Sequence, residues 1–121
     1  MHTIKIENLW FSDTNYRVIY KYELQAGGTT EITGFFDEIL DVQVQEDKIV
    51  VWAAMAPLRK NAKNTWVERR ESEKITIVFA AYGTGFPYDK SIIGTYFRTV
   101  QTPDGLVWHI FVQVKGKELN G

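Results

Sequence analysis

The sequence predicts an all-β, single-domain fold, built as an antiparallel sandwich or open barrel of seven to eight strands. Three observations support this prediction. Polar and apolar residues alternate in several short segments, turn residues separate these segments, and no segment has the periodicity of an amphipathic helix. With 121 residues, of which 45% are hydrophobic, the chain 1–121 is long enough to form one core without further support.

The N-terminal quarter predicts an extra strand followed by a hairpin. Residues 3–9 alternate polar and apolar side chains, which predicts a strand within an N-terminal segment formed by residues 1–15. Residues 17–24 alternate most regularly, and Gly27 and Gly28 separate them from a short β-prone segment, residues 29–33. This pattern predicts that the two segments pair as an antiparallel hairpin.

The middle of the chain predicts a second hairpin and then a loop. Residues 39–45 alternate with Asp41 on the solvent side, a polar turn follows, and residues 48–55 are apolar on both faces, as in a central strand. Residues 56–73 are polar and basic, which predicts a long polar loop. Its last part, from residue 66 onward, fits either a solvated ribbon or a short helical turn, and the neighbouring strands favour the ribbon.

The C-terminal half predicts three more strands, at residues 75–82, 91–100 and 106–114. Gly94 interrupts the second of them, which indicates a bulge or a close backbone approach. Residues 102–105 (TPDG) form a strong turn signal, and residues 115–121 are expected to be a frayed tail.

Composition excludes several classes of function. The net charge of -1 lacks the basic excess of proteins that grip nucleic acid through its phosphates. Since the chain has no cysteine, disulfides, thiolate nucleophiles and cysteine-ligated metals are excluded. No apolar run approaches the roughly 20 residues of a membrane-spanning helix, and the first residues do not resemble a signal peptide. We therefore expect a cytoplasmic protein without membrane association.

The loop at residues 82–89 (YGTGFPYD) is the first candidate site. Its glycines could expose backbone N–H groups to a small ligand, and its rings could stack on it. The alternative is a tight connection in which glycine only permits positive φ, because the strand–loop–helix context of a phosphate-binding loop is missing. The predicted ligand-binding residues are Tyr82, Gly83, Thr84, Gly85, Phe86, Tyr88 and Asp89.

The second candidate site is the only local concentration of positive charge. Basic groups around a tryptophan could contact a partner protein or, less favoured, nucleic acid. The alternative is a solvated loop, since glutamates neutralise the second half of the segment. The predicted partner-binding residues are Arg59, Lys60, Lys63, Trp66, Arg69 and Arg70.

Catalytic and metal-binding constellations are not apparent. His2 and His109 are the only histidines, and neither has a partner at a spacing typical of a base or a metal ligand. Acidic residues fall at turns and on expected outer strand faces. We therefore predict no enzyme activity, no cofactor and no metal site.

Aromatic residues are more numerous than a small core requires. Trp10, Trp66 and Tyr88 fall at strand ends or loops, where aromatic side chains are frequently interface residues, although they could also cover the ends of the core. The sequence thus favours a binding surface. An apolar-rich open sheet of this size also predicts a homo-oligomer.

Five segments in order carry a family resemblance: YRVIYKYEL at 16–24, ILDVQVQEDKIVVWAAM at 39–55, YGTGFP at 82–87, IIGTYF at 92–97 and GLVWHIF at 105–111. The chain resembles a family of short, uncharacterised phage and prophage proteins with the pattern IYKY…VQVQ…WA…GTGHP…YIGTF…GLVFHLF. This chain differs by its N-terminal strand, by a longer loop after residue 56, and by Phe86 where relatives often have histidine.

The resemblance implies a phage-borne accessory protein and assigns no activity. Three functions follow as hypotheses. The first is a phage- or prophage-encoded binding protein that counteracts a host defence or another host process, by binding a macromolecule or sequestering a small nucleotide-like ligand. The second is a virion or assembly component that pairs through edge strands. The third is a small enzyme acting on a nucleotide at the 82–89 loop, assisted by His109.

Overall fold

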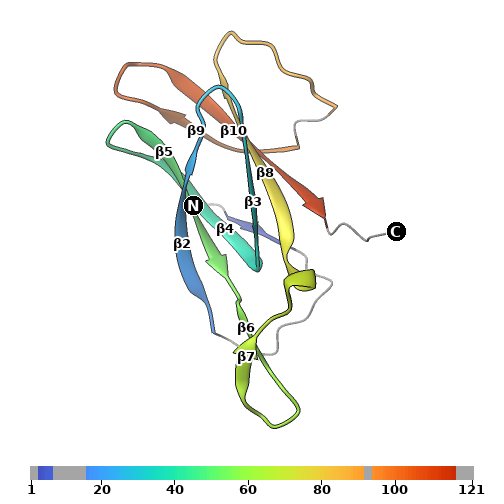
Figure 1. Ribbon diagram of the computed structural model, residues 1–121. Coiled ribbons are helices and arrows are strands. Elements are labelled where there is room, and N and C mark those ends of the chain that lie inside the picture. The colour runs from blue at the N-terminus through green and yellow to red at the C-terminus, as the bar shows by residue number, and fades with distance from the viewer. Residues whose placement is uncertain (1–2, 7–15, 92–93, 117–121) are drawn as a thin grey trace.

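The computed structural model describes residues 3–6, 16–91 and 94–116 and confirms an all-β architecture. Two four-stranded antiparallel sheets, with strand orders β1-β4-β5-β2 and β3-β8-β10-β9, form an open sandwich rather than a closed barrel (Figure 1). A two-stranded hairpin, β6-β7, extends from one end. The strands are β1 (Ile4–Lys5), β2 (Val18–Leu24), β3 (Thr29–Gly34), β4 (Phe36–Gln45), β5 (Lys48–Met55), β6 (Leu58–Lys60), β7 (Trp66–Glu68), β8 (Ile75–Gly83), β9 (Thr95–Gln101) and β10 (Val107–Gly116).

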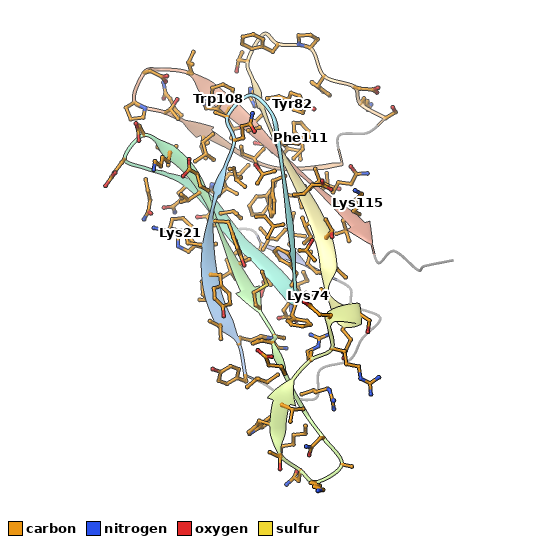
Figure 2. All side chains as sticks on the ribbon, viewed as in Figure 1. Lys21, Lys74, Tyr82, Trp108, Phe111 and Lys115 are labelled. Atoms are coloured by element: carbon orange, nitrogen blue, oxygen red, sulfur yellow. The ribbon has the colours of Figure 1, made fainter. Side chains whose placement is uncertain are left out.

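The core fills the space between the two sheets (Figure 2). Side chains of each long strand alternate between the core and the outer face, and the central strands β4, β5 and β8 contribute most of the core. The largest fully buried side chains are Phe36, Phe79, Ile39, Ile49, Ile77, Ile110, Val42 and Val51. In the last strand, Trp108, Ile110 and Val112 face the core.

The predicted pairing of residues 17–24 with residues 29–33 is wrong. β2 pairs with β5 and β3 pairs with β8, so the connection between them crosses from one sheet to the other. Gly27, with φ of 79°, makes this crossing possible, and its N–H donates to the Ala81 carbonyl at 3.0 Å. The crossing lets β2 and β3 bury their apolar faces against each other's sheet.

Asp41 is buried, although the sequence placed it on the solvent side; it lies opposite Trp52, next to a bulge in β4. The register shifts between Ile39 and Asp41, so both Ile39 and Val42 reach the core and Leu40 is the extra residue. Asp41 is only 5% exposed. Its carboxylate forms an ion pair with Arg98 Nε at 3.2 Å, which joins β4 of one sheet to β9 of the other.

Residues 56–73, expected to be a long polar loop, contain regular structure. They form the β6-β7 hairpin and then a 3₁₀ turn over Glu71–Glu73, where the sequence favoured an extended ribbon. The tip is closed by Asn61, whose side-chain oxygen accepts the N–H groups of Lys63 and Thr65. The 3₁₀ turn is the only helical segment in the described ranges, and no helix there could cross a membrane.

The predicted turn at residues 102–105 is present. The Thr102 carbonyl accepts the Gly105 N–H at 2.9 Å, and Gly105 has a φ of 89°. Hydrogen bonds from the Thr102 hydroxyl and the Leu106 N–H lower the pKa of the Asp104 carboxyl. Other parts of the expected features lie outside the described residues: residues 7–15 of the N-terminal segment, residues 92–93 of the strand expected at 91–100, and residues 117–121 of the tail.

Gly94 makes the close backbone approach that the sequence indicated. It has a φ of 87°, and a Cβ at this position would lie 2.5 Å from the Val112 carbonyl oxygen. No larger residue therefore fits where the chain enters β9 without moving the edge of the sheet.

We expect Gly94→Ala to lower the free energy of unfolding by about 3 kcal/mol or more, since it combines backbone strain with a clash. Gly105→Ala is the matched control. Gly105 has nearly the same φ, 89°, but a Cβ there would meet no atom within 4 Å. That variant should lose only about 1–2 kcal/mol, the cost of the left-handed backbone. Equal losses for the two variants in urea denaturation would contradict the close approach.

Candidate functional site

The outer face of the β8-β10-β9 sheet gathers aromatic and hydroxyl side chains at one end. The antiparallel register sets Tyr82 opposite His109, and His109 opposite Thr99. Phe111 lies opposite Tyr96 of β9. Because side chains alternate along a strand, these residues share the face that points away from the core.

Aromatic rings surround Phe111 on this face. Its ring centroid lies 5.6 Å from that of Tyr88, 5.7 Å from that of Tyr96 and 6.3 Å from that of Tyr82. Tyr82 and Tyr88 are themselves 5.8 Å apart. Figure 2 shows Tyr82 and Phe111 close together at the end of the sheet, where the 84–91 segment leaves it. We call Tyr82, Phe86, Tyr88, Tyr96 and Phe111 the aromatic face.

A chain of polar groups borders these rings. The Tyr96 hydroxyl lies 2.6 Å from Thr99 Oγ1, which lies 3.1 Å from His109 Nδ1. The other ring nitrogen, Nε2, is 2.7 Å from Thr84 Oγ1. Since hydroxyls can donate or accept, both imidazole nitrogens are satisfied in either tautomer. The imidazole is half-buried and is held in orientation by the hydroxyls of Thr84 and Thr99.

The loop presents Phe86 and Tyr88 to solvent. Gly85 has a φ of 90°, which reverses the chain, and the Phe86 N–H donates to the Gly83 carbonyl at 3.1 Å. A Cβ on Gly83 would lie 2.9 Å from the Phe86 ring, so a larger residue at position 83 would clash with this ring. On the far side of the loop, the Asp89 carboxylate accepts hydrogen bonds from the Ser91 hydroxyl and N–H. These hydrogen bonds lower the pKa of the Asp89 carboxyl.

These groups enclose a hollow of about 310 Å³ that is open to solvent on one side. Six of the seven residues predicted to bind a ligand line it, and Asp89 does not. Tyr96, His109 and Phe111 complete the lining, although the sequence did not place them in this site. The full lining is Tyr82, Gly83, Thr84, Gly85, Phe86, Tyr88, Tyr96, His109 and Phe111, and it contains no Asp, Glu, Lys or Arg.

The predicted partner-binding residues separate into two groups. Lys60 and Trp66 face each other across the β6-β7 hairpin, with Lys60 Nζ 4.8 Å from the Trp66 ring. Lys63 and Arg70 are exposed, and Arg59 is half-buried with its Nε buried and without a hydrogen-bond partner in the described part of the chain. These residues leave a small basic surface around an exposed tryptophan.

Arg69 belongs to the second group, because it is only 4% exposed and is not part of that basic surface. Its guanidinium donates to the Ala56 carbonyl at 2.9 Å, pairs with Glu73 at 3.2 Å and lies 5.2 Å from the Phe35 ring. Burial alone would raise the pKa of the Glu73 carboxyl. Hydrogen bonds from the Arg70 N–H and the Arg69 guanidinium outweigh burial and lower that pKa. Arg69 therefore anchors the hairpin to the sandwich.

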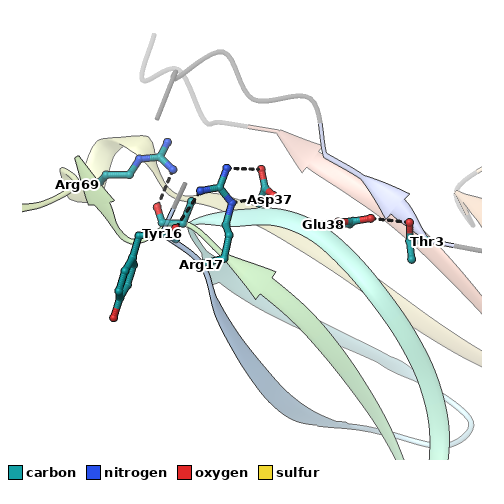
Figure 3. Close-up of polar contacts among 7 residues, drawn as sticks. Thr3, Tyr16, Arg17, Asp37, Glu38 and Arg69 are labelled. Atoms are coloured by element: carbon teal, nitrogen blue, oxygen red, sulfur yellow. Dashed lines mark hydrogen bonds and ion pairs between the residues drawn. The ribbon is translucent and has the colours of Figure 1, made fainter. Parts of the chain in front are cut away.

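The acidic residues near the start of β4 do not form a catalytic pair. Asp37 is held by Arg17 at 2.9 Å, and Glu38 accepts a hydrogen bond from Thr3 at 2.6 Å (Figure 3). In the ranges that the structure describes, no three His, Asp or Glu side chains come together as a metal site would require. The chemistry that the aromatic face offers is stacking and hydrogen bonding.

The pair formed by Arg69 and Glu73 predicts a pH-dependent stability. Because the pKa of Glu73 is lower in the folded chain than its ordinary value of 4.5, the ionised carboxylate stabilises the fold above that value. This stabilisation is lost as the pH falls through the folded pKa. We expect Glu73→Gln to lower the free energy of unfolding at pH 7 by about 1–3 kcal/mol, the range for hydrogen bonds to charged groups. The difference from wild type should shrink below pH 4.

Glu71→Gln is the control for that measurement. Glu71 pairs with Lys74 at 2.7 Å, but its side chain is 81% exposed. A surface ion pair of this kind contributes little, so the free energy of unfolding should change by no more than about 0.5 kcal/mol. Equal effects of the two substitutions in urea titrations from pH 3 to pH 7 would contradict the anchoring role.

Comparison with known proteins identifies the family of this chain but does not identify an activity. Neither the curated proteins nor the solved structures include a match to this chain. The model of one family, a domain of unknown function called DUF7352, matches residues 15–121. The match confirms the resemblance to an uncharacterised family and begins after the N-terminal segment that the sequence set apart. The chain belongs to the DUF7352 family.

Proposed function

We propose that this chain is a binding protein and that the aromatic face contacts a partner protein. The observation that carries the proposal is the exposure of three rings on a surface without charge: Phe86 is 66% exposed, Tyr88 52% and Tyr96 49%. The centres of protein interfaces are enriched in aromatic residues and depleted of charged ones. Rigid aromatic side chains at such positions also contribute most of the binding energy.

A nucleotide fits this site less well than a protein surface. Phosphate groups require cations or several free backbone N–H groups, and the lining contains no Lys or Arg. The Phe86 N–H is already donated to Gly83, and the Thr84 N–H to Val107. Small-molecule sites also enclose most of their ligand, whereas this hollow lies open on the face of a sheet.

A flat, uncharged small molecule is the second candidate ligand. The hollow of about 310 Å³ is at the lower end of the size of ligand pockets. A ring could stack on Phe111 and Tyr88 while its polar edge exchanges hydrogen bonds with the Thr84 and His109 pair. This alternative predicts a bound mass of a few hundred daltons.

We propose that binding occurs without catalysis. The recorded hydrogen bonds of His109 go to the hydroxyls of Thr84 and Thr99, and both nitrogens are occupied. A general base needs a free nitrogen aimed at the reacting group and benefits from a carboxylate behind it. The hydroxyl chain instead favours a fixed imidazole that shapes the surface.

The resemblance to phage and prophage proteins supports a more specific setting. We propose that the protein acts in the cytoplasm of an infected or lysogenic bacterium and binds a host protein, thereby counteracting a defence system or another host process. The supporting observations are membership of a family without assigned activity and an aromatic face whose lining contains no charged residue. A structural role in the virion is the competing proposal, and finding the chain in purified particles would favour it.

The first experiment is native mass spectrometry of the protein purified from bacterial cells that express it. We expect wild type to retain a protein partner, and Phe86→Ala/Tyr88→Ala to lose it with at least a tenfold drop in occupancy, since truncating central aromatic residues costs about 2 kcal/mol or more. Trp66→Ala removes an exposed ring from the hairpin instead and should retain the partner. Loss in Trp66→Ala alone would move the interface to the hairpin. A small adduct would favour the second candidate.

The proposed setting predicts an effect on infection. In a bacterial strain whose defence system restricts a test phage, we expect the wild-type chain to raise the efficiency of plating. Phe86→Ala/Tyr88→Ala should not raise it, although it should accumulate to the same level. An equal effect of wild type and this double variant would contradict the role of the aromatic face.

A further inference from the structure

The edge strands of the two sheets are not equally protected. Native proteins shorten, bulge or charge the edges of their sheets, because unpaired backbone groups there can pair with another chain. β1 has two residues, and β4 beside it carries two bulges. β9 contains an irregularity opposite Ile110 and Phe111. β3 carries Glu31, which pairs with Lys115 at 2.9 Å.

β2 is neither short nor bulged, and its two charged residues, Lys21 and Glu23, have opposite signs, so they do not exclude an antiparallel partner. It pairs with β5 over seven consecutive residues without a register shift, and it contains neither proline nor glycine. Its other edge has no strand partner within the described residues, and Figure 1 shows β2 on the left side of the molecule. It is the longest regular edge in the two sheets.

Exposed apolar side chains gather at one point of this edge. Ile19 is 61% exposed on the outer face of the sheet. Tyr20 is 46% exposed although it lies opposite the core residue Ala53, because β2 is the outermost strand of its sheet in the described part of the chain. The Tyr22 ring lies 6.4 Å from the Tyr20 ring, which extends the apolar surface along the inner face.

We infer that β2 pairs with β2 of a second copy of this chain, antiparallel, with the two-fold axis at Tyr20. When two copies of one strand pair antiparallel about a two-fold axis, the residue numbers of any two facing residues add up to the same value. An axis at Tyr20 sets Tyr20 against itself, Ile19 against Lys21, Val18 against Tyr22 and Arg17 against Glu23. It therefore buries the two most exposed apolar side chains of the strand, and the aliphatic part of Lys21 covers Ile19.

This register also matches charges. Arg17 would face Glu23 of the second copy, twice in the dimer, and opposite charges across a strand pair stabilise it. Each group already has a partner in its own chain: Arg17 pairs with Asp37 at 2.9 Å, and Glu23 with Lys48 at 3.6 Å. Pairing would join them into two alternating rows of four charges.

The other registers are disfavoured. An axis at Lys21 would set that lysine against itself, and an axis at Ile19 would set Arg17 against Lys21. Like charges directly opposite each other destabilise a strand pair. An axis at Tyr22 would set Lys21 against Glu23, but it would leave the exposed Ile19 opposite Gln25, beyond the end of β2. Among the registers without like charges opposed, only the axis at Tyr20 sets both Ile19 and Tyr20 opposite residues of β2.

The first test is the molar mass in solution, by light scattering at 1–100 µM (about the range in which a weak dimer dissociates). We expect wild type to approach twice the 14.0 kDa of the chain. Ile19→Lys faces Lys21 of the second copy and should raise the dissociation constant about tenfold or more. Leu106→Lys, at an apolar residue 50% exposed in the 102–105 turn region, is the control and should leave the dimer intact. A monomer at every concentration overturns the inference.

The second test determines the register of the β2–β2 pair, and it does not require that the Ile19→Lys variant folds correctly. Since the chain has no cysteine, each single-cysteine variant carries one thiol. Directly opposed residues bring their Cβ atoms to about 4.5–5.5 Å, close to what a disulfide needs. Under mild oxidation, Tyr20→Cys should form a covalent dimer at least tenfold faster than Tyr22→Cys or Glu31→Cys. Faster cross-linking of Tyr22→Cys overturns the register, and faster cross-linking of Glu31→Cys overturns the choice of edge.

Discussion

The antiparallel pairing of β8 with β10 is the constraint on which both the core and the aromatic face depend. Its register sets Ala81 against Ile110 on the inner face and Tyr82 against His109 on the outer face. A slip of one residue would exchange the two faces along the whole strand. Since Ile110 is fully buried, exposing it would cost about 1.5–3 kcal/mol by itself. The position of the aromatic face is thus maintained by the residues behind it.

Alternation along the chain was sufficient to predict the long strands but not their partners. Each segment carries its own period of two, whereas the choice of neighbour depends on which arrangement buries the apolar faces of all segments together. For this reason β2 and β3, adjacent in sequence, lie in different sheets. The burial of Asp41 is hidden for a related reason: the residue has the period of an outward side chain and lies opposite Trp52, but Arg98 of the other sheet pairs with it.

The candidate site was predictable only where it is continuous in sequence. The loop that contains Phe86 and Tyr88 could be recognised by its glycines and rings, but Tyr96 and Phe111 join it through the β9-β10 register, which no local pattern reveals. In the basic segment, the sequence assigned one residue too many to the surface. Arg69 lies among charged neighbours and was predicted to bind a partner, but it is buried. The spacing of Arg69 and Glu73, four residues apart, was the available sign of an internal pair.

The two proposed contacts lie on different sheets, and their geometry makes them compatible. Pairing at Tyr20 keeps the inner faces of both β1-β4-β5-β2 sheets on the same side, because Tyr20 faces its own symmetry mate. The β3-β8-β10-β9 sheet of each copy therefore lies on that side as well, and the two aromatic faces point in the same direction. A partner with repeated binding sites could engage both faces, and the second contact would form at a high effective concentration. The dimer would then convert two modest aromatic contacts into tight binding of an oligomeric or filamentous partner, while a partner with one site would gain nothing from it.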